Sequence, residues 1–526
     1  MIKICIVGAG FTGYLTAIAL KKNCPQASIT LIDSQTEPKN FGFGESCPPF
    51  FLRWLVAKLG IAPSEQQEWL VNFLKETNST IKASVKLQNW NDTSDLGYFV
   101  PFVFNKPAND LIGQAPDSYK LTDLWYELYI KGLRKSSDFD KDVGNLYYTL
   151  SDNRIPFEDQ KFVESDTLTV NIASYEVMKW FEKHYKHLLD HVIDITVCGV
   201  ELTETGSVKC LVDQEGNKHR HDLYLDCTGF KRILSKHVDF DWQPPHSRIL
   251  HDSAVLTAKC YSNNDDICNE MVPYTTFLGM PYGWSWGIPL LNRKSYGYVF
   301  DSNYADADSI TKTLVDKIGK DNIVQEPLLI KWTTGWNKQA WSKNVITVGI
   351  ASGFIDALDA NSIAIQTQQV NAIINAVNSP RYLRDSRDTY NQLVDGLFVD
   401  LVDRQDIHFA LAPRNDTDYW KKNHSAYSKQ ELLEFVNRKL TENIDSSGKF
   451  HLFFDMVWLT YFMYYGNDLS SRCRKSKPEL IEAGLKYFSD RNHTQMQKSK
   501  NHPTPIEWMQ AIGINPNDQI LVGKKL

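Results

Sequence analysis

The residues best suited to chemistry are one lysine and two tryptophans that follow glycine-rich loops in the sequence. Lys82 lies after two loops of the kind that bind dinucleotide cofactors. Trp284 and Trp286 are two positions apart, so on a strand their rings point to the same side. A dinucleotide loop predicts a redox cofactor, and large apolar rings beside it would keep a substrate away from it. We therefore expect a flavin enzyme that makes a diffusible oxidant and passes it to the lysine.

The first loop, GAGFTG, lies between an apolar run at residues 2–7 and a helix-like segment that reaches residue 22. A second apolar run ends in an acid 20 positions after the third glycine of the loop. This order of strand, turn, helix, strand and acid is typical of dinucleotide-binding units. The glycines let the backbone approach a pyrophosphate, and the helix N-terminus attracts phosphate. The predicted cofactor contacts are Gly8, Gly10, Phe11, Thr12, Gly13 and Asp33.

Three later segments favour FAD over a nicotinamide cofactor, which the first loop alone does not distinguish. They are a second glycine-rich turn at 42–49 and two apolar strands ending in small-residue turns, at 223–229 and 345–354. Each one alone fits an ordinary strand–turn–helix connection. Because strand ends at one edge of a parallel sheet line the ligand crevice, the three together fit a long, extended cofactor. The predicted contacts are Gly44, Glu45, Ser46, Gly349 and Ile350.

The composition of the chain indicates the cell compartment in which it works and the kinds of partner that we do not expect it to bind. The net charge of −6 over 526 residues argues against a nucleic-acid partner, because phosphate binding needs a concentrated basic surface. Nine cysteines without a CxxC pair predict reduced thiols and a cytoplasmic location. No apolar stretch has the length of a membrane span, so we expect no membrane association.

Three histidines have a spacing that could hold a metal on one face of a helix. His184, His187 and His191 fall within an amphipathic segment at residues 174–192. Because lysines lie beside them on the polar side, we interpret the histidines as a solvated face and expect no metal site.

At this point the chain resembles the flavin-dependent tryptophan halogenase family over most of its length. The two glycine-rich loops resemble the opening flavin loops of that family, and the segment at 79–82 resembles the one that carries its catalytic lysine. The most specific match is the WxWxIP signature. That signature is formed by Trp284, Trp286, Ile288 and Pro289. Segments around His408 to Trp420 and at 458–466 resemble the substrate domain and its cap.

The resemblance implies a mechanism. Reduced FAD from a separate flavin reductase would react with O2 and a halide ion to give hypohalous acid. The acid would pass through the protein to Lys82, and the tryptophans and Pro289 would separate the flavin from the substrate. Lys82 would either donate hydrogen bonds to the acid or attack it as a neutral amine, which burial favours. A small, electron-rich aromatic ring held nearby would then be halogenated.

The sequence departs from the family pattern at two places. Asp359 stands where the family has a catalytic glutamate, and its side chain is shorter by one methylene. Asp356 is an alternative candidate for the catalytic carboxylate. The resemblance assigns halide binding to backbone N–H groups, here those of Asn361 and Ser362. Val100 replaces a ring-stacking histidine, so we expect an indole or phenol instead of free tryptophan. The aspartate at 359 and the altered pocket lead us to expect bromide or iodide over chloride. The predicted substrate contacts are Phe99, Pro101, Phe102 and Trp458.

We expect an α/β fold in two regions. Residues 1–375 would form a Rossmann-like FAD-binding module of the GR2 monooxygenase type, with an antiparallel sheet that carries the WxWxIP strand. Residues 376–526 would form a mainly helical cap over the substrate site. Two alternatives share the flavin loops: a flavin monooxygenase that hydroxylates an aromatic substrate, and a non-catalytic FAD-binding protein. A homo-oligomer is left open.

Overall fold

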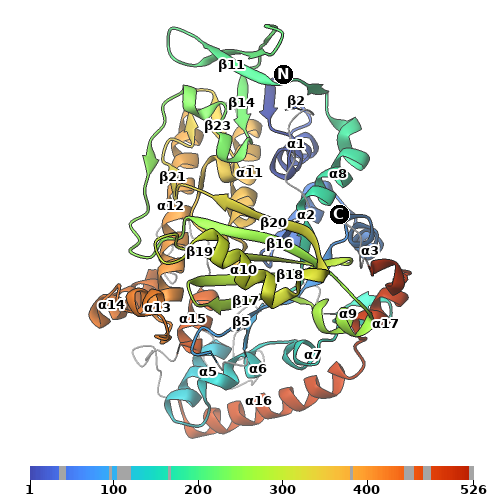
Figure 1. Cartoon of the computed structure of the whole chain (residues 1–526), viewed down its shortest axis with the longest axis vertical. Helices are drawn as coiled ribbons and strands as arrows, with labels where there is room; N and C mark the ends of the chain where they lie inside the picture. Colours follow the sequence, from blue (N-terminus) through green and yellow to red (C-terminus); the bar gives the residue numbers. More distant parts are fainter. Residues whose placement is uncertain are drawn as a thin grey trace.

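The computed structural model shows mixed α/β architecture in which two sheets meet at an angle (Figure 1). It describes residues 1–34, 43–93, 97–102, 120–163, 167–379, 383–442, 455–465 and 476–520. The predicted α/β fold class is confirmed, with a parallel sheet, a mostly antiparallel sheet and helices after residue 383. Among these residues, no helix has both the length and the apolar character that crossing a membrane requires.

The first sheet is the predicted dinucleotide-binding unit. Its strand order is β10-β2-β1-β14-β23-β22, and all neighbours are parallel except the edge strand β22. The strands are β1 Lys3–Val7, β2 Ser28–Asp33, β10 His191–Asp194, β14 Leu223–Asp226, β22 Trp341–Ser342 and β23 Val345–Thr347. Helix α1 (Phe11–Asn23) follows the first loop and packs against α8 (Ser174–Tyr185) and α11 (Asn361–Asn378). The strand, turn, helix, strand and acid expected from the sequence are therefore present.

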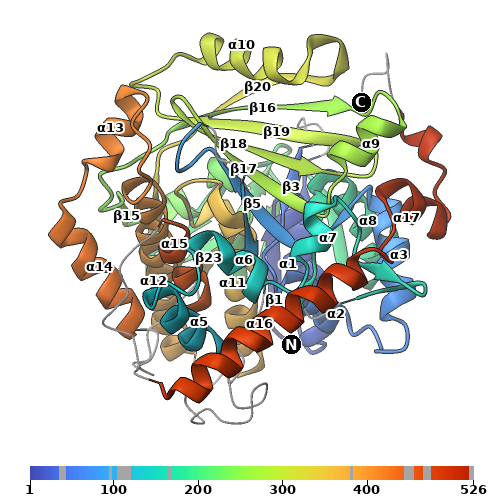
Figure 2. The ribbon, with the colours of Figure 1, turned by 90° about the horizontal axis from the view of Figure 1, so that it is seen from below.

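The second sheet carries the tryptophan strand at its centre. Its order is β20-β16-β19-β18-β17-β5-β6, and only the β17–β5 pair is parallel. The strands are β5 Ser84–Gln88, β6 Tyr98–Pro101, β16 Ser253–Cys260, β17 Tyr274–Met280, β18 Gly283–Pro289, β19 Arg293–Phe300 and β20 Ile323–Lys331. Helix α10 (Ala307–Ile318) covers the outer face, where Ile310 and Leu314 pack on Tyr296 and Tyr298 (Figure 2).

A three-stranded sheet joins the second glycine-rich segment to Lys82. Strand β9 (Thr169–Ala173) pairs on one side with β3 (Gly44–Ser46) and on the other with β4 (Thr80–Lys82). Helices α2 (Phe51–Leu59) and α3 (Gln66–Thr77) connect β3 to β4.

The smaller strands lie in other sheets. They are β7 Phe157–Glu158, β8 Lys161–Phe162, β11 Val197–Leu202, β12 Val208–Asp213, β13 Lys218–His219, β15 Trp242–Gln243, β21 Gly335–Asn337 and β24 Gly353–Phe354.

The remaining helices complete the fold, and most of them lie in the lower half of the molecule (Figure 1). They are α5 Leu121–Ile130, α6 Phe139–Val143, α7 Tyr147–Ser151, α9 Asn264–Glu270, α12 Leu383–Ala410, α13 Asp418–His424, α14 Lys429–Glu442, α15 Asp455–Tyr464, α16 Pro478–Ser499 and α17 Pro505–Ala511. Arg491 of α16 donates to the carbonyls of Asp142, Val143 and Gly144, which fixes the α6–α7 connection. Because α11 runs across position 375, the division into 1–375 and 376–526 stays a prediction.

The expectation that three histidines share one helix face is wrong. Helix α8 ends at Tyr185, His187 follows in a short 3-10 turn, and His191 begins strand β10. His184 instead lies 2.8 Å from a carboxylate oxygen of Glu76. Because the helix ends at Tyr185, His187 and His191 do not share a helix face with His184.

Candidate active site

The first glycine loop has the geometry that a pyrophosphate needs. Gly8 has φ +98°, and a Cβ at Gly13 would lie 1.8 Å from the Gly8 carbonyl oxygen, so both positions require glycine. A Cβ at Gly10 would meet no atom within 4 Å, which leaves open space beside the N-terminus of α1. Gly349, with φ +64°, lies against Thr12, and Asp33 ends β2. These residues fit a dinucleotide cofactor.

The second glycine-rich segment lies directly on the tryptophan strand. The Gly44 N–H donates to Ser295 Oγ at 2.9 Å, and a Cβ at Gly44 would lie 2.7 Å from Ile288 Cγ2. Ser46 Oγ lies 2.8 Å from Thr275 Oγ1, and burial raises the pKa of Glu45. The predicted cofactor strand and the predicted barrier are therefore in contact, although they are about half of the chain apart in sequence.

A cavity opens between the turn that follows β23, helix α11 and helix α12. It holds about 240 Å³ of empty space, including the part open to solvent, and Gly349, Asp356 and Ser362 are among its lining residues. Asn361 and Ser362, the predicted halide-binding positions, form the first turn of α11. Since a helix N-terminus favours anions, this turn is a suitable place for a halide beside the cofactor edge.

The two tryptophans are buried in the sheet. Trp284 is fully buried, its Nε1 lies 3.3 Å from Asp356 Oδ1, and its ring meets Phe277 edge-on at 5.1 Å between centroids. Trp286 covers Gly297, where a Cβ would come within 2.3 Å of the indole. The rings and Ile288 lie on one face of β18, as strand alternation predicts.

Lys82 is buried, with 2% of its surface exposed. Its Nζ donates a hydrogen bond of 2.8 Å to the Cys47 carbonyl and lies 5.2 Å from the centre of the Phe102 ring. Burial lowers the pKa of Lys82 to about 8, against the opposing effects of the Cys47 thiol and the Asp359 carboxylate. The amine of Lys82 therefore lies between the residue that follows β3 and an aromatic ring, so Lys82 is not a surface lysine.

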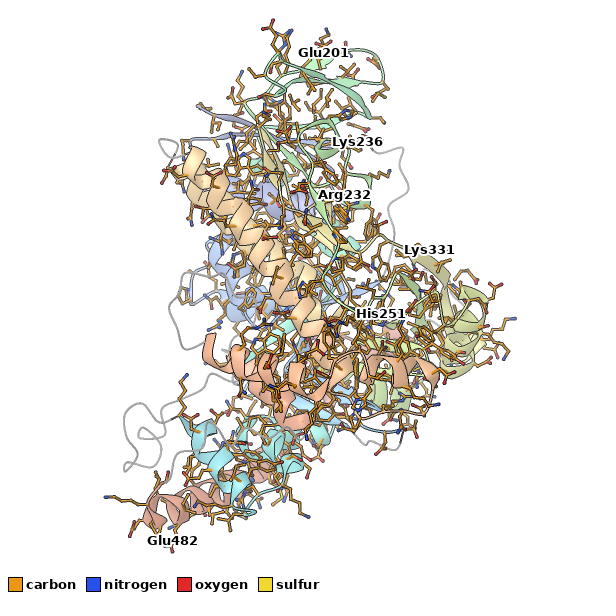
Figure 3. The ribbon with its side chains drawn as sticks, turned by 90° about the vertical axis from the view of Figure 1, so that its left-hand side faces the viewer. Glu201, Arg232, Lys236, His251, Lys331 and Glu482 are labelled. Carbon is orange, nitrogen blue, oxygen red and sulfur yellow. The ribbon has the colours of Figure 1, made fainter. Side chains whose placement is uncertain are left out.

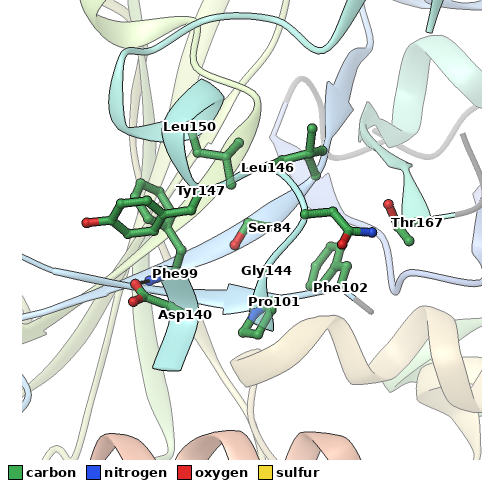
Figure 4. Close-up of a pocket in the computed structure, with 12 residues that line it drawn as sticks. Ser84, Phe99, Pro101, Phe102, Asp140, Gly144, Leu146, Tyr147, Leu150 and Thr167 are labelled. Carbon is green, nitrogen blue, oxygen red and sulfur yellow. Dashed lines mark hydrogen bonds between the residues drawn. The ribbon is translucent and has the colours of Figure 1, made fainter. Parts of the chain in front are cut away.

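A second cavity lies next to the lysine strand (Figure 4). It holds about 290 Å³, including the part open to solvent, and its wall includes Phe99, Pro101 and Phe102. Tyr147 and Leu146 contribute from the α6–α7 segment, which the sequence patterns did not indicate because those helices are short and lack a motif. Val100 is on the opposite face of β6 from Phe99 and Pro101 and is not among the lining residues within the described chain.

Trp458 does not line this cavity within the described residues. It is fully buried in α15, where its ring packs against Phe435 and Phe462. The guanidinium of Arg404 lies 5.7 Å from the centre of the Trp458 ring. Of the four predicted substrate contacts, Phe99, Pro101 and Phe102 line this cavity. The fourth, Trp458, lies against the buried Arg404 instead.

Three polar side chains contact the carboxylate of Asp359. Its Oδ2 lies 2.9 Å from Arg404 Nη2 and 3.5 Å from His408 Nε2, and Tyr461 donates to Oδ1 at 2.9 Å. Burial alone would raise the pKa of Asp359, but Arg404 and His408 outweigh it and hold the pKa well below its usual range. Burial and Arg404 also lower the pKa of His408 to about 4, so this ring is neutral at pH 7. Arg404 and Tyr461 carry no local sequence signal, because only tertiary packing brings them to Asp359.

Comparison with known proteins places these features in a family. The family model described as "Tryptophan halogenase" matches residues 3–475. Tryptophan 6-halogenase ThaL of Streptomyces albogriseolus is 26% identical over 516 residues, covering 93% of this chain and 94% of that protein. Tryptophan 7-halogenase RebH of Lentzea aerocolonigenes is 24% identical, covering 86% and 85%. The crystal structure of tryptophan 6-halogenase SttH from Streptomyces toxytricini superposes with a TM-score of 0.82 at 22% identity, over 97% of this chain and 100% of that one.

Proposed function

Since the chain belongs to the tryptophan halogenase family and is therefore a flavin-dependent halogenase, we propose that Lys82 delivers hypohalous acid to an aromatic substrate. The observation that carries the proposal is the burial of the Lys82 amine between the carbonyl of the cofactor segment and the aromatic cavity. Lys82 is catalytic in this proposal because it meets the oxidant. The Trp284–Pro289 strand keeps the organic substrate on the lysine side.

The cofactor is FAD in reduced form, bound at Gly8 to Gly13, Asp33, Gly44 to Ser46 and the turn at Gly349 and Ile350. Reduced FAD supplies, with O2 and a halide ion, the hypohalous acid. The open face of Gly10 and the cavity beside Gly349 support this assignment. The N–H groups of Asn361 and Ser362 hold the halide at the start of α11.

The substrate is a small indole or phenol held against Phe99 and Phe102 in the cavity next to the lysine strand. Ser84 and Thr167 add polar groups to the wall of that cavity. Bromide or iodide is preferred over chloride, because both are easier to oxidise. A separate flavin reductase supplies reduced FAD by diffusion, and the enzyme is cytoplasmic, in keeping with the free thiols of the eight cysteines within the described residues.

The proposal is tested by supplying the protein with a generic flavin reductase, FAD and O2, and screening indoles and phenols against chloride, bromide and iodide by mass spectrometry. We expect mono-halogenated products, with bromide or iodide giving the higher yield. Hydroxylated products without halogen would instead indicate a monooxygenase. Oxidation of flavin with no modified aromatic and no trapped hypohalous acid would contradict the proposal.

The reactive form of Lys82 follows from its pKa of about 8. Because the pKa is lowered from 10.5, the neutral amine is the minor form below pH 8 and the major form above it. If the neutral amine accepts the halogen, halogenated product per oxidised flavin rises through pH 8 and then levels, and this is the expected result. The ratio is measured by chromatography from pH 6.5 to 9.5, with flavin oxidation followed in parallel. A fall through pH 8 would instead assign the role to the ammonium as a hydrogen-bond donor.

A further inference from the structure

Four buried side chains form a hydrogen-bonded chain behind the tryptophan strand. Asp356, His251, Tyr419 and Trp284 each have at most 1% of their surface exposed. His251 Nδ1 lies 2.7 Å from Asp356 Oδ2, and His251 Nε2 lies 2.6 Å from the Tyr419 hydroxyl. A neutral ring satisfies both contacts when Nδ1–H donates to the carboxylate and the hydroxyl donates to Nε2. Figure 3 labels His251 beside the lower end of a long helix, in keeping with its 3.5 Å approach to Gln405 of α12.

Asp356 connects three segments that are distant in sequence. Its carboxylate faces His251 from the segment before β16, Trp284 Nε1 from β18 at 3.3 Å, and the Leu358 N–H of its own turn at 3.2 Å. Asp356 also lines the cavity beside Gly349 that the proposed cofactor would enter. A carboxylate has about four acceptor positions, so one group can hold all three donors at once.

The turn that follows Asp356 is strained. Asp359 has φ +63° and Ala360 has φ +60°, and both residues have a Cβ. Non-glycine residues in this region cost roughly 1–3 kcal/mol each and persist only where surrounding contacts fix them. The fixing contacts include the Leu358 N–H on Asp356, the amide of Asn361, which donates to the Leu358 carbonyl, and the contacts of the Asp359 carboxylate described above. This turn carries both Asp359 and the first turn of α11.

We propose that Asp356, fixed by His251 and Tyr419, is a positioning residue that holds the Asp359–Ala360 turn and the Trp284 ring in register. In that arrangement the halide-binding turn stays at the cavity beside Gly349 and the Trp284 ring stays against Asp356, so that oxidant passes inward to the lysine instead of escaping. The inference rests on the proposed function for its catalytic consequence, but its structural part stands independently of it. Asp356 acts through its neighbours and not on the reacting atoms.

The test is the variant Asp356→Asn, which keeps the size of the side chain but replaces one acceptor oxygen by an NH2 group. With reduced FAD, O2, bromide and indole as probe, we expect flavin oxidation to be retained. Product per oxidised flavin should fall on the order of tenfold to a hundredfold, the scale of small misplacements. The KM for bromide should rise, and sulfoxide formed from added methionine, with catalase present, should report the escaped hypobromous acid. In a crystal structure of the ligand-free variant, residues 359 and 360 should leave the left-handed region or the Trp284 ring should move.

Two further variants keep the inference falsifiable. Tyr419→Phe removes only the outer hydrogen bond to His251, so a smaller loss in the same direction is expected. Asp403→Asn is the matched control, because Asp403 Oδ1 contacts His246 Nε2 at 3.0 Å elsewhere on α12 and the charge change is identical; its product ratio should equal that of the unmodified protein. An Asp356→Asn protein with an unchanged product ratio, or with the turn and the ring in place, overturns the inference. If the unmodified protein halogenates no probe, the proposed function fails, and the structure of the variant still decides this inference.

Discussion

Replacing Lys82 by alanine is expected to abolish halogenated product while flavin oxidation continues at its normal rate. The proposed cofactor contacts at Gly8 to Gly13, Gly44 and Gly349 do not involve the Lys82 side chain, so oxidant formation should be retained. Without the amine, the described wall of the cavity offers polar side chains such as Ser84, Asn145 and Thr167, but no amine that can accept the halogen. The loss should be at least on the order of a thousandfold, within the range for a positioned reactive group. Product is measured by mass spectrometry and flavin oxidation by absorbance.

Two variants separate chemistry from packing in this experiment. Lys82→Met fills the space of the lysine stem without the amine, so it should be as inactive as Lys82→Ala. Lys86→Ala removes the neighbouring lysine, whose Nζ lies 5.3 Å from the Phe99 ring centre and 5.8 Å from that of Tyr274, and it should keep most of the activity. Full activity in Lys82→Met, or equal losses in the Lys82 and Lys86 variants, would remove Lys82 from the mechanism.

The parts of the fold that could be predicted are those in which local pattern and tertiary structure agree. The apolar run at 2–7 became β1, the segment after the glycine loop became α1, and the run ending at Asp33 became β2. The glycines specify this unit because a Cβ at Gly13 would collide with the Gly8 carbonyl. The alternation of Trp284 and Trp286 likewise predicted a strand with both rings on one face.

The surroundings of the site could not be predicted in the same way, because they depend on contacts between distant segments. Arg404 is one polar residue among many along α12, and only packing against α15 and the turn after β24 brings it to Asp359. His251 has no neighbouring motif, yet it is fully buried on Asp356. The histidine spacing at 184–191 misled for the opposite reason: the pattern continued in the sequence, but the helix ended at Tyr185.

Breaking the buried pair of Asp359 and Arg404 is expected to cost more stability than replacing the whole pair. Arg404 is fully buried and 10% of the Asp359 side chain is exposed, so either Asp359→Asn or Arg404→Met alone leaves one charge in a poorly solvated place. Removing one partner of such a pair costs about 3–5 kcal/mol, whereas apolar or neutral replacement of both is often close to neutral. The double variant should therefore unfold at a higher temperature than either single variant.

The measurement is a double-mutant cycle by urea or thermal unfolding of the ligand-free protein, which isolates the coupling between the two side chains. Lys21→Met and Asp190→Asn form the matched control cycle. That pair is 2.7 Å apart, against 2.9 Å for Asp359 and Arg404, but its side chains are 33% and 21% exposed for Asp190 and Lys21, so its coupling should be small. Asp359→Asn should also lower product per oxidised flavin, since the Asp359 charge acts on Lys82 and its turn leads into the proposed halide site. Additive effects at 359 and 404 would mean that the carboxylate does not depend on the guanidinium. Asp359 would then be free to act as a base, as the family glutamate is expected to do, instead of being held as a fixed anion beside the lysine.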